Sequence, residues 1–237
     1  MNRRFARGFL LSVALVAAFA VSGCTVVHNN SINGSTLTIG SAPYTEGSGN
    51  LTTATRALES FHAVSVENGL RVLVKTGSAA SAAVTADDNL VGLITTEVRD
   101  GTLSIRVSGS LTTHERLEVE VTAASAVDSV AQTGGSTVDV ENLSSDSVTA
   151  SVDGGSTLHA GGRTANLQLT VNGGSTADLR NVEAQVAQVQ IDGGSTAFVK
   201  AQKSIAGSCN GGSTLKASGS AGTGTVSKDS GSTVAGD

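Results

Sequence analysis

Short runs in which apolar and polar residues alternate recur along the chain, and most are attached to the same tetrapeptide. Gly-Gly-Ser-Thr starts at five positions, and a degenerate copy, Ser-Gly-Ser-Thr, starts at Ser230. The five complete copies start at Gly134, Gly154, Gly173, Gly193 and Gly211. Successive copies are 18 to 20 residues apart. A fixed period of this length is typical of a solenoid, in which each repeat buries its apolar side against its neighbours.

Each repeat is predicted to form a strand, a tight corner and a second strand. The residue before the glycines is Asp or Asn in all but the first copy, and Asx-Gly sequences favour tight turns. After the corner, apolar residues alternate with polar ones, as in Leu158-His159-Ala160, which indicates a strand with one buried face. Before the corner, Val152, Val171, Ile191 and Cys209 form an inward column. The ends of that column, Gln132 and Lys228, are polar, and we expect them to meet water.

These observations predict an all-β fold: a right-handed parallel β-helix, or solenoid, with coils of about 19 residues and a less regular N-terminal strand region. The solenoid is expected over residues 57–237, with the Gly-Gly-Ser-Thr repeats in 131–237. Residues 57–130 lack the Gly-Gly corner but contain alternating runs, and Asp100-Gly101 is a hairpin signal. We interpret them as irregular opening coils; a separate small domain is the alternative. Strands are expected at 61–66, 70–75, 82–86, 94–99, 102–107 and 117–122.

The N-terminus has the pattern of a lipoprotein signal peptide over residues 1–23. Arg3, Arg4 and Arg7 precede an apolar stretch too short to span a bilayer. Val21-Ser22-Gly23-Cys24 then resembles the bacterial lipobox, and this resemblance implies lipidation of Cys24, including an acyl chain such as palmitate on its new amine. An ordinary secretory signal with a chance cysteine is the alternative. The lipid at Cys24 would make the membrane a partner of the protein.

Residues 24–56 are rich in Ser, Thr, Gly and Asn and are predicted to be a lipidated flexible tether. Ile32–Ile39 resembles one repeat, so an additional strand is possible there. Thr25 follows the lipidated position, where an Asp tends to retain lipoproteins in the inner membrane of Gram-negative bacteria. We therefore expect a lipid-anchored protein of the bacterial cell envelope, on the outer membrane in a Gram-negative source and otherwise on the outer face of the plasma membrane.

Composition narrows the range of partners. The net charge is −5, and removal of the three signal-peptide arginines makes the mature chain more acidic still. This charge disfavours nucleic acid and anionic membrane surfaces as partners. Aromatic residues make up 3% of the chain, so stacking platforms for sugars are scarce, and Phe198 is the clearest outward one.

Several stretches resemble a known family. They are Phe61–Val66, Asn68-Gly69-Leu70-Arg71-Val72, Asp88-Asn89-Leu90 and Gly101–Ile105, followed by the glycine-centred repeats. In order and spacing they resemble the putative auto-transporter adhesin, head GIN domain family, over roughly residues 57–220. The resemblance implies a β-helical fold, no recognised catalytic residues and a role in adhesion. The chain departs from the family name because it has no C-terminal pattern of long alternating membrane-barrel strands.

Three features were weighed as chemistry. Gly207-Ser208-Cys209-Asn210-Gly211 matches the sequence pattern of a nucleophile elbow. It lies between two predicted strands, however, and no His follows it in the sequence. A buried core thiol at Cys209 is therefore favoured. Asp153, Asp192 and Asp229 suggest calcium, but their period differs from the calcium-binding nonapeptide, so turn formation is favoured. The Ser and Thr of the repeats are expected to form stacked hydroxyl ladders that add cross-coil hydrogen bonds or present a repetitive face to ice, glycan or polymer.

The sequence therefore predicts a non-enzymatic, lipid-anchored module that binds or adheres through a repetitive Ser/Thr face. No catalytic, metal or cofactor-binding residue is proposed; Cys24 is the one modified site. The expected ligand is an envelope polymer, glycan or protein. A periplasm-facing accessory or structural protein is the first alternative, and a carbohydrate-active β-helix enzyme is the second.

Overall fold

The computed structural model describes residues 30–32, 35–37, 44–113, 116–223 and 225–236. The predicted signal peptide, Cys24 and much of the predicted tether lie outside these residues. The chain divides into two units, and the boundary between them in the sequence falls between Pro43 and Tyr44. In the first unit, β1 (Asn30–Ile32) pairs with β2 (Ser35–Leu37) in antiparallel fashion. The expected additional strand near Ile32 is therefore a two-stranded pair of its own.

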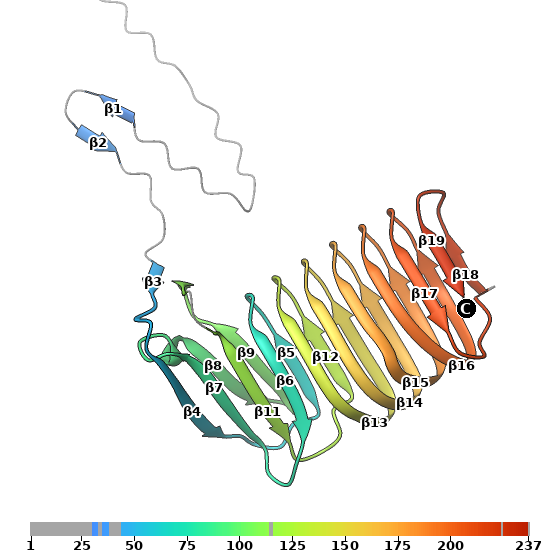
Figure 1. Ribbon diagram of the computed structural model, residues 1–237, viewed down its shortest axis with the longest axis horizontal. Helices are drawn as coiled ribbons and strands as arrows, with labels where there is room; N and C mark the ends of the chain where they lie inside the picture. The colour runs from blue at the N-terminus through green and yellow to red at the C-terminus, as the bar shows by residue number, and fades with distance from the viewer. Residues whose placement is uncertain (1–29, 33–34, 38–43, 114–115, 224, 237) are drawn as a thin grey trace, which may run out of the picture. The chain divides into compact units, whose positions relative to one another are not determined.

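Most strands of the second unit stack into one large sheet (Figure 1), and two short strands form a separate pair. Its N-terminal strands are β3 (Tyr44–Glu46), β4 (Leu51–Ala57), β5 (Ala63–Val66), β6 (Arg71–Thr76), β7 (Ser81–Asp87), β8 (Ile94–Arg99), β9 (Thr102–Val107), β10 (Ser110–Thr112), β11 (Glu118–Ala123) and β12 (Ser129–Gln132). A short 3-10 helix, η1 (Val91–Leu93), precedes β8. The repeat strands are β13 (Thr137–Val152), β14 (Thr157–Val171), β15 (Thr176–Ile191), β16 (Thr196–Cys209), β17 (Thr214–Ser218), β18 (Thr225–Lys228) and β19 (Thr233–Gly236).

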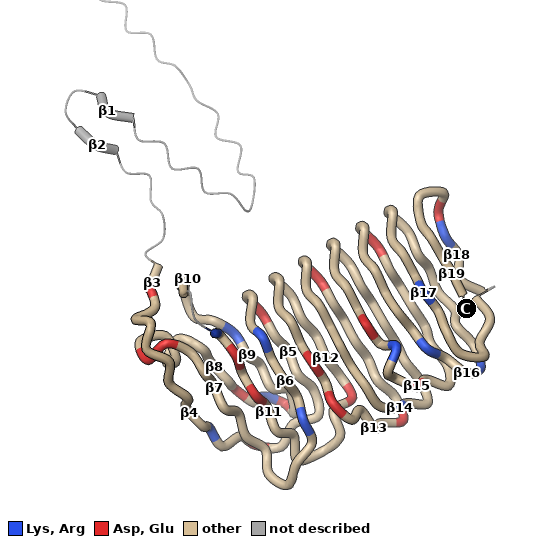
Figure 2. Tube along the Cα trace, in the orientation of Figure 1, with Lys and Arg blue, Asp and Glu red and all other residues tan. Residues whose placement is uncertain are grey.

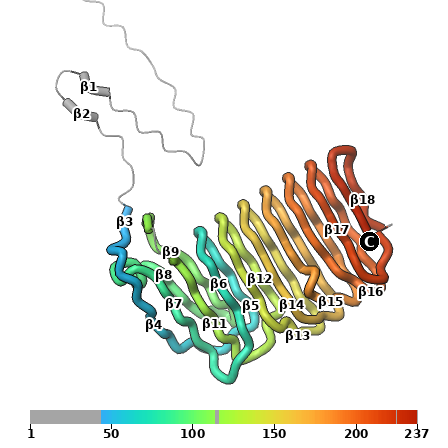
Figure 3. The backbone as a smooth tube through the Cα atoms, viewed as in Figure 1, coloured from blue at the N-terminus to red at the C-terminus, as the bar shows by residue number. Residues whose placement is uncertain are grey.

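The repeats form the predicted parallel solenoid, with about five turns (Figure 3). The threonines of the repeats lie directly opposite one another on neighbouring parallel strands. They are Thr137, Thr157, Thr176, Thr196, Thr214 and Thr233. Each of β13 to β16 continues from one Gly-Gly corner almost to the next. The short strands expected before the corners, such as 167–171, are therefore the final parts of these long, bent strands.

Gly-Gly corners reverse the chain once in every coil. At the second corner Gly154 has a φ of 64° and Gly155 a φ of 77°, a backbone region in which glycine meets no Cβ clash. The side chain of Asp153 caps this turn, because its Oδ1 accepts a hydrogen bond of 2.8 Å from the Gly154 N–H. The predicted role of this Asp in turn formation is confirmed.

The core is a set of apolar columns that run along the solenoid axis. Val152, Val171, Ile191 and Cys209 are completely buried, as the sequence predicts. The prediction for Gln132 is wrong. Its side chain is 1% exposed, because β5 and β9 stack beyond it and place Val66 and Ile105 further along the same column. Lys228, at the opposite end, is exposed as expected.

The N-terminal strands other than β3 and β10 belong to the same sheet as the repeats, and the whole N-terminal region falls in one compact unit with them. All six strands expected in this region are present within a residue or two of their predicted bounds. Asp100-Gly101 joins β8 to β9 as an antiparallel hairpin, and both residues have positive φ. Strands β4 and β8 pair in antiparallel fashion with β7 and β9, which differs from the parallel stacking of the repeats.

The folded unit begins earlier than the boundary expected at residue 57. Strand β3 pairs with β10, and β4 pairs along its whole length with β7. The buried carboxylate of Asp87 also holds this segment, because it accepts a hydrogen bond of 2.6 Å from the Gly49 N–H. Residues 44–56 are therefore part of the folded unit and not of the tether. Their Thr- and Gly-rich composition concealed a strand that is exposed along one side.

Candidate functional site

The strand segments that follow the Gly-Gly corners carry a column of mostly ionisable side chains on their outer side. The central outward column is Asp139, His159, Asp178, Phe198 and Lys216, in register on β13 to β17. We call the outer side of these segments and of β6 the charged face. Figure 2 shows acidic and basic residues distributed along these strands.

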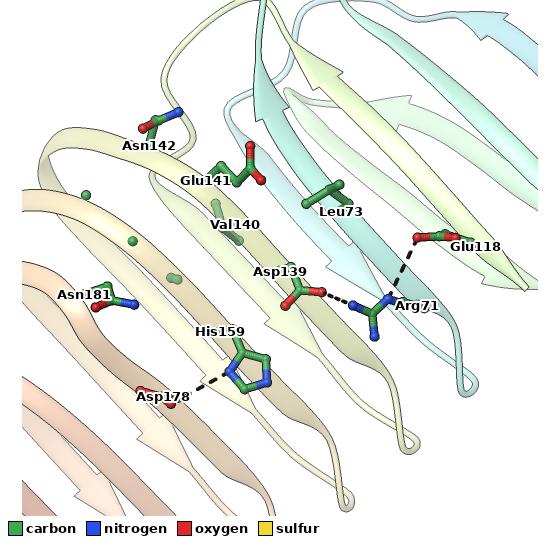
Figure 4. A pocket seen from close by; sticks show the side chains of 13 residues that line it. Arg71, Leu73, Glu118, Asp139, Val140, Glu141, Asn142, His159, Asp178 and Asn181 are labelled. Atoms are coloured by element: carbon green, nitrogen blue, oxygen red, sulfur yellow. Dashed lines mark hydrogen bonds and ion pairs between the residues drawn. The ribbon is translucent and has the colours of Figure 1, made fainter.

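A shallow groove of about 790 Å³ lies on the charged face. Its polar lining includes Arg71, Glu118, Asp139, His159, Asp178 and Asn181 (Figure 4). Arg71 holds one end: its Nη2 donates to Asp139 Oδ2 at 2.9 Å, and its Nε lies 3.8 Å from Glu118 Oε1. These contacts join three strands that are far apart in the sequence.

Asp178 organises the other end of the groove. Its carboxylate accepts hydrogen bonds from Arg180 Nε, at 2.9 Å, and from Arg180 Nη2, and it lies 3.9 Å from His159 Nδ1. The hydrogen bond from Arg180 is the main cause that lowers the pKa of Asp178 below its ordinary value, and the same bond raises the pKa of Arg180. Asp178 is therefore a fixed anion at neutral pH.

The groove offers polar side chains for recognition. Arg71 is paired with Asp139, and Asp178 with Arg180, and because the groove is open these ions stay hydrated. Within the described residues, no group of three or more His, Cys, Asp or Glu is placed to hold a metal ion. The arrangement is suited to reversible contact with a polar ligand.

Beside the groove, two cations converge on one aromatic ring. The Arg180 guanidinium lies 4.6 Å from the centroid of the Phe198 ring, and Lys216 Nζ lies 5.3 Å from it. These three residues are spread over 37 positions of the sequence, from Arg180 to Lys216. The missing signal was register: Phe198 and Lys216 occupy one column on adjacent coils, and Arg180 follows Asp178 of the same column by two residues.

The strand segments before the corners present a different surface, which we call the neutral face. Two outward columns run in register from β9 to β18, and none of their residues is charged. One column is Ser104, Ser65, Ala131, Ser151, Thr170, Gln190, Ser208 and Ser227. The other is Thr102, Ala63, Ser129, Thr149, Gln168, Gln188, Ala206 and Thr225. Hydroxyl and amide groups therefore repeat at the strand spacing of about 4.8 Å.

The repeat serines are not on the surface, which corrects half of the predicted Ser/Thr face. Ser136, Ser156, Ser175, Ser195, Ser213 and Ser232 are all buried. The hydroxyls of the last five accept hydrogen bonds from backbone N–H groups of the preceding coil, such as Ser156 N–H to Ser175 Oγ at 3.2 Å. The Ser136 hydroxyl instead donates to the Thr133 carbonyl at 2.9 Å. The serines form an internal ladder, whereas the neighbouring threonines are at least partly exposed.

Cys209 is a core thiol, as predicted. It is completely buried in the apolar column, and burial raises the pKa of its thiol. Asp229 serves a corner: its Oδ2 accepts a hydrogen bond of 2.8 Å from the Gly211 N–H. A hydrogen bond with the Ser232 hydroxyl is the main cause that lowers the pKa of Asp229.

Among the described residues, no helix is long and apolar enough to cross a membrane. The lipidation predicted at Cys24 lies outside these residues.

Stacked coils, a closed apolar core and two contrasting outer faces define a β-solenoid protein that exposes its side chains on broad surfaces. The chain belongs to the family described as "putative auto-transporter adhesin, head GIN domain", whose profile matches residues 60–221. This confirms the resemblance found in the sequence. An adhesin-type family favours a binding protein of the cell surface or envelope over an enzyme.

Solved structures share the fold. A putative adhesin from Bacteroides fragilis is 18% identical, with a TM-score of 0.67, over 81% of this chain and 99% of that chain. A putative adhesin from Parabacteroides merdae is 14% identical, with a TM-score of 0.53, over 83% of this chain and 100% of that chain. At these identities the similarity shows the fold alone. A search of curated proteins found no match.

Proposed function

We propose that this protein is a non-enzymatic, lipid-anchored module of the bacterial cell envelope that binds an uncharged, hydroxyl-rich polymer through its neutral face. The observation that carries this proposal is the pair of outward columns from β9 to β18, which contain hydroxyl, amide and methyl side chains and no charge. A neutral glycan presents complementary hydroxyl groups at regular spacing. Many weak contacts along a rigid face then add to a useful affinity.

Several features support this function. The family is adhesin-like, and the ionisable groups of the charged face are largely paired with one another. The neutral face is built from the same segments that form the core columns, so its side chains are held at fixed positions. Peripheral hydroxyl and amide groups on a rigid scaffold lose little entropy on binding.

The binding experiment uses the full mature protein in detergent and insoluble cellulose and chitin as neutral glycan probes. We expect the wild-type protein to sediment with at least one of them. Thr170→Lys and Gln188→Lys, which place charges in the middle of the neutral face, should abolish retention. Thr176→Lys, on the charged face, is the matched control and should leave retention unchanged. Equal retention of all three variants would exclude the neutral face as the binding surface.

The anchor and the location are tested separately. Cys24→Ser should move the protein from the membrane fraction to the soluble fraction and remove acyl-chain labelling. Protease treatment of intact and lysed cells then locates the solenoid. Degradation on intact cells supports adhesion at the surface. Protection until lysis would replace adhesion with a periplasm-facing accessory role, in which the same neutral face holds an internal envelope polymer.

A further inference from the structure

We infer that the depression around Phe198 is a binding site for an oxyanion, a carboxylate or phosphate group carried by an extracellular polymer. The depression has a volume of about 410 Å³ and is lined by Arg180, Phe198, Lys216, Ala217, Ser218 and Ala235. No carboxylate is part of this lining, although the whole chain has a net charge of −5. The site lies on the charged face, and it is independent of the function proposed for the neutral face.

Arg180 is fixed in position for such a ligand. Asp178 accepts hydrogen bonds from Nε and Nη2 of Arg180, and the flat guanidinium lies against Phe198. Nη1 has no hydrogen-bond partner among the described residues. The side chain is 61% exposed, so its free donors face solvent. Because Asp178 and Phe198 already hold the guanidinium in one orientation, it loses little entropy when its free N–H groups bind an anion.

Lys216 supplies the second positive charge. Its ammonium lies over Phe198, and within the described part of the chain no carboxylate lies within ion-pair distance of it. Lys200, on the adjacent strand β16, does have an acidic partner, because its ammonium lies 2.8 Å from the carboxylate of Glu183. Lys216 is therefore an exposed cation whose charge is not neutralised by the protein.

The two cations are close enough to act together. Because each lies near the centroid of the same ring, Arg180 Cζ and Lys216 Nζ are no more than about 10 Å apart. Like charges at this distance repel weakly in water, and an anion that contacts both removes the repulsion. Phe198 stands in register between the strands that carry the two cations, so the anion contacts both of them from the solvent side of the ring. Ser218 adds a hydroxyl at the rim. Charge-assisted hydrogen bonds from a guanidinium and an ammonium are the usual means by which proteins hold carboxylate and phosphate groups.

The test is affinity electrophoresis of the full mature protein in gels that contain polygalacturonate, polyphosphate or dextran. We expect retardation by one of the two polyanions and none by dextran; the polymer that retards the protein identifies the carboxylate or the phosphate as the preferred group. Lys216→Gln should weaken binding about tenfold, as the loss of one charge-assisted contact predicts. Phe198→Leu should weaken it as well, because the ring no longer positions the two cations.

Lys203→Gln is the matched control, since it removes the same charge from an exposed residue of β16 outside the depression. It should change binding less than twofold. Equal losses in Lys203→Gln and Lys216→Gln would reduce the effect to general electrostatics and overturn the site. Wild-type protein that is retarded by neither polyanion would overturn it too. Thr170→Lys, which tests the neutral face, should leave polyanion binding intact, so the two proposals fail separately.

Discussion

Gln132 lies in register with Val152 in a column that is apolar on both sides of it, and neither polar atom of its amide has a hydrogen-bond partner among the described residues. The side chain is 1% exposed. A buried amide without partners costs free energy, because it gives up its hydrogen bonds with water. The fold therefore contains one defined source of instability at the junction of the irregular coils and the repeats.

Gln132→Leu should stabilise the protein. The substitution keeps a similar volume and removes the unpaired amide, so we expect a gain of about 1 to 2 kcal/mol in the free energy of unfolding. For a unit of this size that corresponds to an increase of roughly 2 to 8 °C in Tm. Thermal unfolding by circular dichroism measures it. Gln168→Leu, on the exposed neutral face, should change Tm little, and a lower Tm for Gln132→Leu would show that the amide has a partner in solution.

Ser175→Ala should destabilise the solenoid although serine and alanine are similar in size. The Ser175 hydroxyl accepts hydrogen bonds from the Gly155 N–H, at 3.1 Å, and the Ser156 N–H, at 3.2 Å. Its removal withdraws the acceptor from the buried Ser156 N–H, at a cost of about 1 to 3 kcal/mol, whereas the exposed Gly155 N–H keeps its hydrogen bond with the Gly173 carbonyl. Urea unfolding measures the loss. Thr176→Ala is the matched control in the next, partly exposed column, and a similar loss in both variants would argue against the internal ladder.

The burial of these serines could have been predicted from the sequence. Val138 and Leu158 point inward, and a strand alternates with period 2, so Ser136 and Ser156, two residues earlier, should point inward too. The alternation of inward and outward residues was applied only to the residues after the corner. It was not extended back to the Ser and Thr, which were therefore assigned to one outer face. The coils themselves were predictable because every copy of the tetrapeptide marks the same corner.

Other features depend on contacts that the repeat does not mark. Gln132 was taken for a terminal residue because β5 and β9, which cover it, have no Gly-Gly corner to align. The depression at Phe198 joins residues of the four strands β15, β16, β17 and β19, and only the register of the strands brings them together. The strand at residues 51–57 pairs in antiparallel fashion, a mode that the repeats do not use.

Gly207→Ala should be strongly destabilising. Gly207 has a φ of 136°, and a Cβ atom there would lie 1.8 Å from the backbone oxygen of Val189 on the adjacent coil. Because the obstacle is backbone, the two coils must separate, and we expect a loss of roughly 3 kcal/mol or more, of the size seen for overpacked sites and strained backbone together. Differential scanning calorimetry measures it. Gly222→Ala, where a Cβ would meet nothing within 4 Å, is the control and should behave as wild type.

Asp178 should contribute to stability at neutral pH and lose that contribution in acid. The hydrogen bond from Arg180 lowers the pKa of Asp178 in the folded protein below its ordinary value of 3.8, so the unfolded chain binds the proton more readily. The contribution is present above the ordinary value and is lost as the pH falls through the lowered pKa of the folded state. Because Arg180 is 61% exposed, solvent screens the pair and keeps its contribution small.

Asp178→Asn should therefore be less stable than wild type in urea at about pH 7, and the difference should shrink as the pH is lowered through and below the ordinary carboxyl range. Glu141→Gln removes an exposed carboxylate of the same groove for which the described residues contain no ion pair, and it should show no such pH-dependent difference. A difference between Asp178→Asn and wild type that stays constant with pH would mean that the Asp178 side chain acts through packing and that its ion pair with Arg180 adds nothing. A difference that disappears in acid would identify the pair as the part of the groove that responds to pH.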